Sequence, residues 1–146
     1  MFENPGRDAR CALLARVKNI AVVGLSPNPL RPSHGVSAAM QRFGYNVIPV
    51  HPAVKTVLGV RAYARLADID QPVDLVNVFR QPEFVSGIVD ECIALGLKAL
   101  WLQDGVIDAA AADRARAAGM LVVMDRCIYR DYKNEYLPGS TPSPKP

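Results

Sequence analysis

The most constraining feature of this sequence is a unit that occurs three times, in which an amphipathic segment ends at a glycine and an apolar run begins at once. Glycine suits the exit of a helix because it enters the left-handed region of backbone space without a Cβ clash. The pattern therefore predicts helices that lead directly into buried strands. The glycines are Gly44, Gly96 and Gly119, and the runs lie at 46–50, 98–102 and 121–123.

Two more apolar runs, at 20–23 and 73–79, have the length and composition of buried parallel strands. Strands that alternate with helices and short connections indicate an α/β protein with right-handed crossovers. We expect a Rossmann-like, doubly wound and mostly parallel sheet with helices on both faces. The sheet has five strands, or six if the stretch at 52–69 adds a short strand rather than a helical turn.

Local signals indicate where the helices begin. A first helix is expected over 7–17, and Ser33 is a candidate N-cap for the second. Pro82 stands at a first-turn position of the third, and Asp108 can cap an alanine-rich fourth. Spacings near four predict the buried face of the third helix, which carries Phe84, Ile88, Cys92 and Leu95.

Length and composition predict one domain, over 1–136, followed by a disordered tail rich in Pro and Ser over 137–146. The net charge of +3 is modest and the basic residues are scattered, which argues against nucleic-acid binding. No apolar run has transmembrane length and the first residues lack a signal-peptide pattern, so we expect a cytoplasmic protein that does not bind membranes. A homodimer is left open, because exposed apolar faces could form one.

The cysteines do not form a recognisable framework. Cys11, Cys92 and Cys127 are odd in number and far apart, and the sequence contains no CxxC pair. This spacing argues against both a set of disulfides and a zinc site. We expect two of the three to be packing residues and no metal to be bound.

The loop after the first strand is the first candidate site. In an open parallel sheet, ligands bind beyond the carboxyl ends of the strands, where the strand order reverses. The loop at 24–35 leads there into a helix N-terminus that favours an anion, and Ser26, Arg31 and Ser33 add donors. A phosphate or pyrophosphate is expected. The alternative is that the prolines only stiffen a surface loop and Ser33 is only a cap.

A redox dinucleotide has little support in this loop. It lacks the G-x-G-x-x-G pattern, and no acidic residue ends the second strand. An NAD(P)-dependent oxidoreductase therefore remains an alternative that rests on the fold alone. The second strand ends at His51, which either contacts the ligand or bonds to nearby backbone.

The later strands end in further candidates. Arg80 follows the third strand and either binds a second anionic group or pairs with Glu83. Gly105 follows the fourth strand and permits close backbone approach. Cys127 follows the fifth strand beside Arg126, where it is either an inert thiol or one with a lowered pKa.

Several segments together resemble one family. They are Val22–Ser26, Arg31–Ser33 with Gly35–Val36, Gly44–Tyr45 with Ile48–Val50, Phe79–Arg80 with Pro82–Glu83, Trp101–Gln103 with Gly105, and Val123–Cys127. In this order they resemble the CoA-binding domain family, the Rossmann-like module also found as the N-terminal domain of the succinyl-CoA synthetase alpha subunit. The similarity is greater to its stand-alone, YccU-like members.

The resemblance implies coenzyme A as the ligand, with its phosphates held by the first loop. His51 with Pro52, Val78 to Arg80, and Gly105 would line the path of the adenosine and pantetheine, although His51 stands where the family usually has asparagine. The complete candidate set is Gly24, Leu25, Ser26, Arg31, Ser33, His51, Pro52, Val78, Phe79, Arg80, Gln103, Gly105 and Cys127.

The synthetase activity does not follow from this resemblance, because it needs a domain with a phosphorylated histidine and a nucleotide-grasp subunit, for which the chain has no room. We therefore expect binding of CoA or an acyl-CoA without catalysis, as in a sensor, carrier or regulator, and no catalytic residues. A further alternative is a thiol redox protein in which Cys127 forms a mixed disulfide with the CoA thiol.

Overall fold

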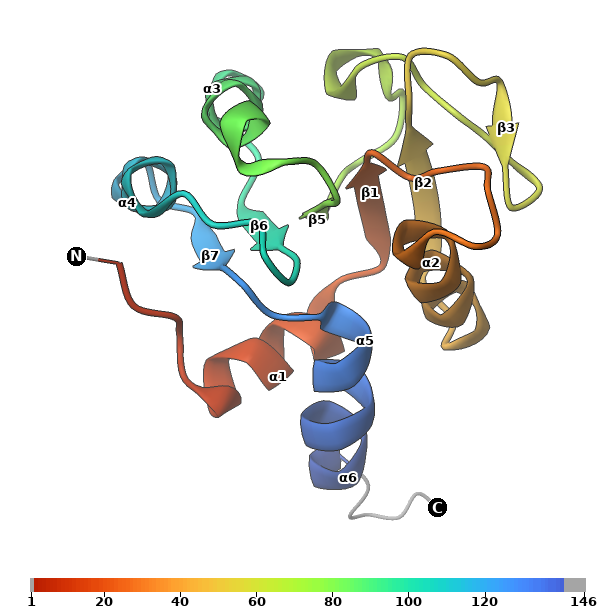
Figure 1. The fold of residues 1–146 in the computed structure, drawn as a ribbon. Helices are drawn as coiled ribbons and strands as arrows, with labels where there is room; N and C mark the ends of the chain where they lie inside the picture. Colours follow the sequence, from red (N-terminus) through yellow and green to blue (C-terminus); the bar gives the residue numbers. More distant parts are fainter. Residues whose placement is uncertain (1, 141–146) are drawn as a thin grey trace.

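A parallel sheet forms the centre of the computed structural model, which describes residues 2–140 (Figure 1). Its spatial order is β2-β1-β5-β6-β7, and each neighbouring pair is parallel. The predicted α/β architecture with five strands in the sheet is therefore confirmed. The strands are β1 (Asn19–Val23), β2 (Asn46–Val50), β5 (Leu75–Val78), β6 (Ala99–Leu102) and β7 (Leu121–Val123).

Helices cover both faces of this sheet, as the doubly wound prediction requires. Successive side chains of a strand point to opposite faces, so Val22 packs with α1, α2 and α5 while Val23 packs with α3 and α4. Both faces are buried, which explains why the strands read as continuous apolar runs. The helices are α1 (Arg7–Arg16), α2 (Pro32–Arg42), α3 (Val85–Ala94), α4 (Ala109–Ala117) and α5 (Ile128–Asp131).

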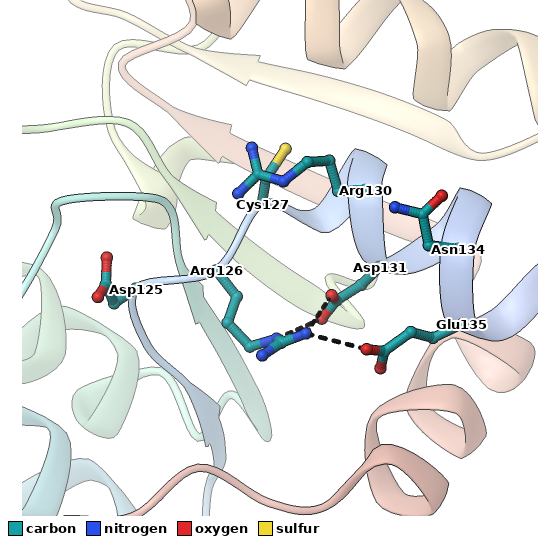
Figure 2. A pocket seen from close by; sticks show the side chains of 7 residues that line it. All are labelled: Asp125, Arg126, Cys127, Arg130, Asp131, Asn134 and Glu135. Atoms are coloured by element: carbon teal, nitrogen blue, oxygen red, sulfur yellow. Dashed lines mark hydrogen bonds and ion pairs between the residues drawn. The ribbon is translucent and has the colours of Figure 1, made fainter.

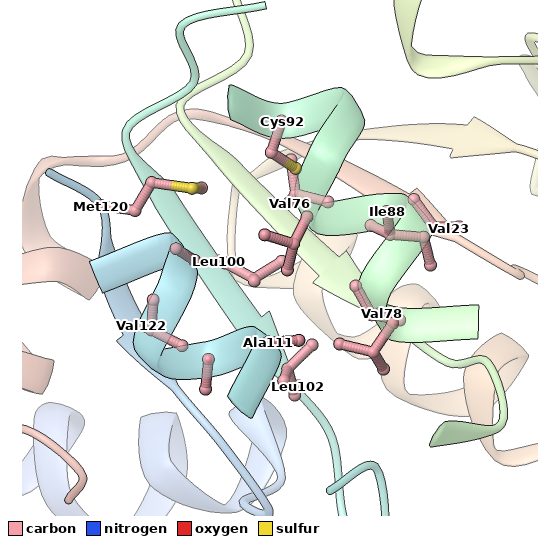
Figure 3. Close-up of a cluster of buried hydrophobic side chains, with 14 of the residues drawn as sticks. Val23, Val76, Val78, Ile88, Cys92, Leu100, Leu102, Ala111, Met120 and Val122 are labelled. Carbon is pink, nitrogen blue, oxygen red and sulfur yellow. The ribbon is translucent and has the colours of Figure 1, made fainter. Parts of the chain in front are cut away.

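The core beneath α3 and α4 differs in one respect from the prediction (Figure 3). The chain begins this element with a 3-10 turn, η2 (Pro82–Phe84), so Phe84 precedes α3, and Leu95 is the C-cap of α3. Phe84 and Leu95, predicted to be buried, are 42% and 43% exposed. Cys92 is buried as predicted, and its burial raises the pKa of the thiol to about 12. The side chains that face the sheet are Val85, Ile88, Val89 and Cys92.

The two predicted N-caps have different outcomes. Asp108 is confirmed, because its carboxylate accepts a hydrogen bond from the Ala111 N–H at 3.0 Å. Ser33 is not a cap: α2 begins two residues earlier than predicted, at Pro32, with Arg31 as the N-cap. Proline is favoured at the first helical position because its missing N–H would be unpaired there anyway. Ser33 is instead buried within the helix.

The stretch at 52–69 adds no strand to the main sheet. β3 (Thr56–Val57) and β4 (Val60–Arg61) pair with each other as a short antiparallel hairpin, and η1 (Leu66–Asp68) is a 3-10 turn. A parallel bridge between Val50 and Tyr63 attaches this segment to the end of β2. The stretch therefore contains both the short strand and the helical turn that were predicted as alternatives.

The C-terminal segment is helical further than predicted. After α5 the helix continues through the π-helical turn η3 (Tyr132–Tyr136) into α6 (Leu137–Ser140), so the start of the expected tail is a helical turn. The rest of that tail, 141–146, lies outside the described residues. None of the described helices has both the length and the apolar composition of a membrane-spanning segment.

Candidate functional site

A cavity lies at the edge of the sheet where the strand order reverses. After β1 the chain goes first to β2 on one side and then to β5 on the other, so the loops after β1 and β5 diverge at this edge. These loops, the loop after β6 and the start of α5 enclose about 540 Å³, which we call the main cavity. Its position is the one that the parallel topology predicts for a ligand.

Most of the predicted site residues line the main cavity. They come from four separate parts of the chain, and the sheet brings them together because parallel strands end at the same edge. These residues are Gly24, Ser26, Arg31, Ser33, Phe79, Arg80, Gln103, Gly105 and Cys127.

Four predicted residues lie elsewhere. Leu25 and Val78 are fully buried in the two cores, so their side chains do not face the cavity. The His51 Nδ1 accepts a hydrogen bond from the Ala53 N–H at 3.0 Å, which is the backbone alternative for this residue. Pro52 lines a smaller neighbouring hollow of about 150 Å³, the side cavity, together with Ala64, Arg65 and Leu66. Arg80 lines both cavities.

The main cavity is also lined by residues that the sequence patterns did not indicate. Most of these residues are next to a predicted site residue in the chain, so they belong to loops that the sequence had already indicated. Arg130 is different because it comes from α5. Its position three residues after Cys127, at the start of a helix, places both on one helical face, and this spacing could have identified it. The residues missed are Pro32, Val36, Gln81, Pro82, Asp104, Val106 and Arg130.

Gly24 allows the loops after β1 and β5 to touch. It has a φ of +87°, and a Cβ at this position would lie 2.5 Å from the Phe79 carbonyl oxygen and 2.8 Å from the Arg80 Cδ. Only glycine fits both the backbone conformation and the space. The contact fixes Arg80 next to the β1 loop.

The β1 loop is held by a chain of side-chain hydrogen bonds. The Ser33 hydroxyl oxygen accepts from the Ser26 N–H, and the Ser26 hydroxyl oxygen accepts from the Asn28 N–H, each at 3.0 Å. The Asn28 Oδ1 then accepts from the Leu30 N–H. Because the serine oxygens act as acceptors here, their hydroxyl hydrogens can still be donated to a ligand. The conformation of the loop is therefore held by its own hydrogen bonds.

Two arginines in the cavity have no carboxylate partner within the described chain. Arg31 is exposed at the start of α2, next to the positive end of the helix dipole. Arg80 places its guanidinium 3.9 Å from the centre of the Phe84 ring, and not on Glu83. The N–H groups of His34 and Gly35 donate to the Arg31 carbonyl oxygen, so the helix end offers fewer free donors than expected. The arginine side chains are the stronger anion ligands here.

The floor of the cavity contains a buried polar pair. Gln103 and Asn77 are 3% and 1% exposed, and the Gln103 Nε2 donates to the Asn77 Oδ1 at 2.6 Å. A buried amide is tolerated because this bond satisfies it. The Gly105 N–H donates to the Asp125 Oδ1 at 2.8 Å, which fixes the loop after β6. The Oε1 of the Gln103 side chain can accept a hydrogen bond from a ligand.

Cys127 has a different cationic neighbour from the one predicted (Figure 2). Arg126 turns away and forms ion pairs with Asp131 at 2.7 Å and Glu135 at 3.1 Å. These carboxylates raise the pKa of Arg126, mainly through the hydrogen bond with Asp131. Arg130 lies near Cys127 instead, and the Asp104 carboxylate accepts two hydrogen bonds from its Nη2, at 2.7 and 2.6 Å. Arg126, its neighbour in the chain, is therefore not the cation that lies beside the Cys127 side chain.

The comparisons with known proteins agree with this geometry. Residues 18–133 match the family model described as the CoA binding domain. YneT of Bacillus subtilis, itself uncharacterized, is 43% identical over 127 residues, which are 87% of this chain and 94% of YneT. An ADP-forming acetate–CoA ligase of Methanocaldococcus jannaschii is 22% identical over 93 residues, which are 64% of this chain but 13% of the ligase.

A solved structure extends the likeness to the whole fold. A hypothetical protein from Pyrococcus horikoshii OT3 superimposes with a TM-score of 0.86 and 31% sequence identity, over 92% of this chain and 99% of that one. The family match covers the β1 loop, both cavities and the start of α5. The chain therefore belongs to the CoA-binding domain family.

Proposed function

We propose that the chain binds coenzyme A or an acyl-CoA in the main cavity, without turnover. The observation that carries the proposal is the pair of arginines, Arg31 and Arg80, that face a cavity at the switch point of the sheet without a carboxylate partner in the described chain. Unpaired guanidinium groups suit the phosphates of CoA, since charge-assisted bonds to phosphate are strong. The family of the chain supports the identity of the ligand.

The two cavities fit the two halves of an elongated nucleotide thiol. Arg80 lines both, so it suits the diphosphate in the middle of the ligand. The adenosine would occupy the side cavity, near Pro52 and Arg65. The pantetheine would follow the main cavity past Val106 and end near Cys127. In this arrangement Pro52 contacts the adenosine, as the family resemblance implied, whereas the His51 side chain does not contact the ligand.

Binding without turnover fits the titratable groups that line the main cavity. They are three arginines, one carboxylate and one thiol, and the Asp104 carboxylate is already hydrogen-bonded to Arg130. General acid–base catalysis needs a group with a free proton site within reach of the substrate. A sensor, carrier or regulator of CoA matches this arrangement better than an enzyme does.

A thermal shift measurement with matched ligands tests the proposal. CoA at a hundred times its dissociation constant is expected to raise the melting temperature by roughly 5–10 °C, because it binds only the folded state. Arg31→Ala and Arg80→Ala should each weaken binding about ten- to a hundredfold, since each removes a charge-assisted bond. Arg16→Ala is the matched control, because Arg16 is exposed on α1 and lines neither cavity.

The same experiment separates the alternatives. It includes acetyl-CoA, NAD, NADP and ATP at equal concentrations. Stabilisation by NAD or NADP with no response to CoA would favour the oxidoreductase alternative. No response to millimolar CoA from a folded sample would contradict the proposed function.

A second candidate function, thiol redox chemistry, is favoured by the place of Cys127 in the main cavity. In this reaction the Cys127 thiolate attacks one sulfur of CoA disulfide, the ligand's S–S bond breaks, and one CoA leaves as a thiolate that takes a proton from water. The product is a mixed disulfide between Cys127 and CoA.

Intact-mass measurement after incubation with CoA disulfide tests this reaction. We expect a gain of one CoA that reductant reverses and that Cys127→Ala abolishes. Cys92 is the internal control, because burial raises the pKa of its thiol to about 12 and it should stay unmodified. Cys11 is free and partly exposed, so the parent and Cys127→Ala are compared: an equal gain in both, or no gain in either, rules out this role for Cys127.

A further inference from the structure

A second hollow lies beside the main cavity, between α2 and α5. It has a volume of about 330 Å³, and we call it the α2 groove. The helices on its two sides contact each other, so the groove follows their junction. From Pro32 to Arg42 it extends along α2 for about 15 Å, at a rise of roughly 1.5 Å per residue. Its lining consists of Pro32, Gly35, Val36, Ala39, Arg42 and Tyr129.

The α2 groove borders the main cavity. Pro32 and Val36 line both hollows, so a ligand that leaves the main cavity here passes over two apolar side chains. The first turn of α5 has residues on both sides: Cys127 and Arg130 line the main cavity, and Tyr129 lines the groove. The border between the two hollows therefore lies at the start of α5, close to Cys127, where the thiol end of bound CoA would lie.

The shape and chemistry of the groove suit a hydrocarbon chain. Gly35 and Ala39 lie one turn apart on the same face of α2 and leave room where larger side chains would fill it. The Tyr129 wall is held by Phe43, whose ring is nearly parallel to it at 6.0 Å and is stacked on Tyr132 at 4.0 Å. Most of the lining has no hydrogen-bonding side chain, so it would leave the polar groups of a sugar or nucleotide unpaired.

We propose that the α2 groove binds the acyl chain of a medium-chain acyl-CoA. This inference rests on the proposed function, because the thioester must lie at the Cys127 end of the main cavity. From the thioester, the acyl chain then crosses Pro32 and Val36. It runs along Gly35 and Ala39 towards Arg42. Its methylene groups are removed from water on the side that faces α2 and Tyr129, which is the source of the affinity.

Titration calorimetry with CoA, acetyl-CoA, hexanoyl-CoA and octanoyl-CoA tests this inference. A fully buried methylene raises affinity roughly fourfold. Because the groove is open on one side, we expect smaller steps, with octanoyl-CoA at least about tenfold tighter than acetyl-CoA. Equal affinities for all four would overturn the acyl-chain inference and leave CoA binding intact. If none of the four binds, the proposed function fails and this inference fails with it.

Gly35→Leu is the variant that blocks the groove. A Cβ at Gly35 meets no atom within 4 Å, and glycine is a poor helix former, so the variant should fold at least as well as the parent. Gly35 does not line the main cavity, so affinity for CoA should stay within about twofold. We expect Gly35→Leu to bind octanoyl-CoA no more tightly than acetyl-CoA.

Two further variants complete the test. Ala38→Leu adds the same side chain to α2 at a position outside both the groove and the main cavity, and it should keep the full gain. Tyr129→Ala removes the wall and should reduce the gain without a change in CoA affinity. A gain that survives in both Gly35→Leu and Tyr129→Ala would mean that the acyl chain lies elsewhere, and would overturn the proposal.

Discussion

Replacement of Gly24 by alanine is expected to lower the free energy of unfolding by about 2–5 kcal/mol and to abolish most CoA binding. Left-handed backbone costs a residue with a Cβ roughly 1–2 kcal/mol, and an overpacked contact adds about 1–3 kcal/mol. The contact is with backbone, at 2.5 Å from the Phe79 carbonyl oxygen, so a rotamer change cannot relieve it. Urea unfolding gives the stability change, and calorimetry gives the loss of affinity.

Gly119→Ala is the control for this effect. Gly119 also has a positive φ, +98°, but a Cβ there meets no atom within 4 Å. Its replacement should cost only the backbone strain and should leave CoA affinity unchanged. The difference between the two variants therefore isolates the contact between the loops after β1 and β5. Equal losses of stability would show that these loops do not touch.

Asp131→Ala is expected to destabilise the protein by about 2–3 kcal/mol, because it removes the buried carboxylate that Arg10 and Arg126 share and leaves both arginines with Glu135 alone. The Asp131 side chain is 6% exposed and accepts two hydrogen bonds from Arg126, at 2.8 and 2.7 Å. It also lies 3.2 Å from the Nε of the buried Arg10, which in addition pairs with Glu135. This network fastens α1 to the helix that presents Cys127 and Arg130. Chemical denaturation monitored by circular dichroism measures the loss.

Asp90→Ala provides the comparison for a solvent-exposed pair. Asp90 accepts a hydrogen bond from Arg114 at 2.8 Å, but their side chains are 69% and 42% exposed. Water and salt screen such a pair, so its loss should cost no more than about 1 kcal/mol. If Asp131→Ala lowered the free energy of unfolding no more than Asp90→Ala does, the buried network would not be what holds α1 against α5.

Local chemistry was enough to predict the sheet and its helix exits. The glycines at 44, 96 and 119 all have positive φ values at the ends of helices, as the pattern required. The apolar runs became strands because a parallel sheet buried on both faces needs uninterrupted hydrophobic residues. Prediction of the cavity followed from the same regularity, since the residues after parallel strands must meet at one edge. Ser26, Arg80 and Gly105 were found in this way.

The sequence by itself thus determined the class of fold, the edge of the sheet at which the main cavity lies and most of the residues that line it. Only the tertiary structure decided which side chains turn towards the main cavity. Arg126 forms an ion pair with Asp131, whereas Arg130 lines the main cavity. The residues around them in the chain do not predict which of the two arginines has which partner. The α2 groove likewise exists only because α5 packs beside α2. Orientation depends on partners distant in the chain, and their competition is settled only when the elements pack.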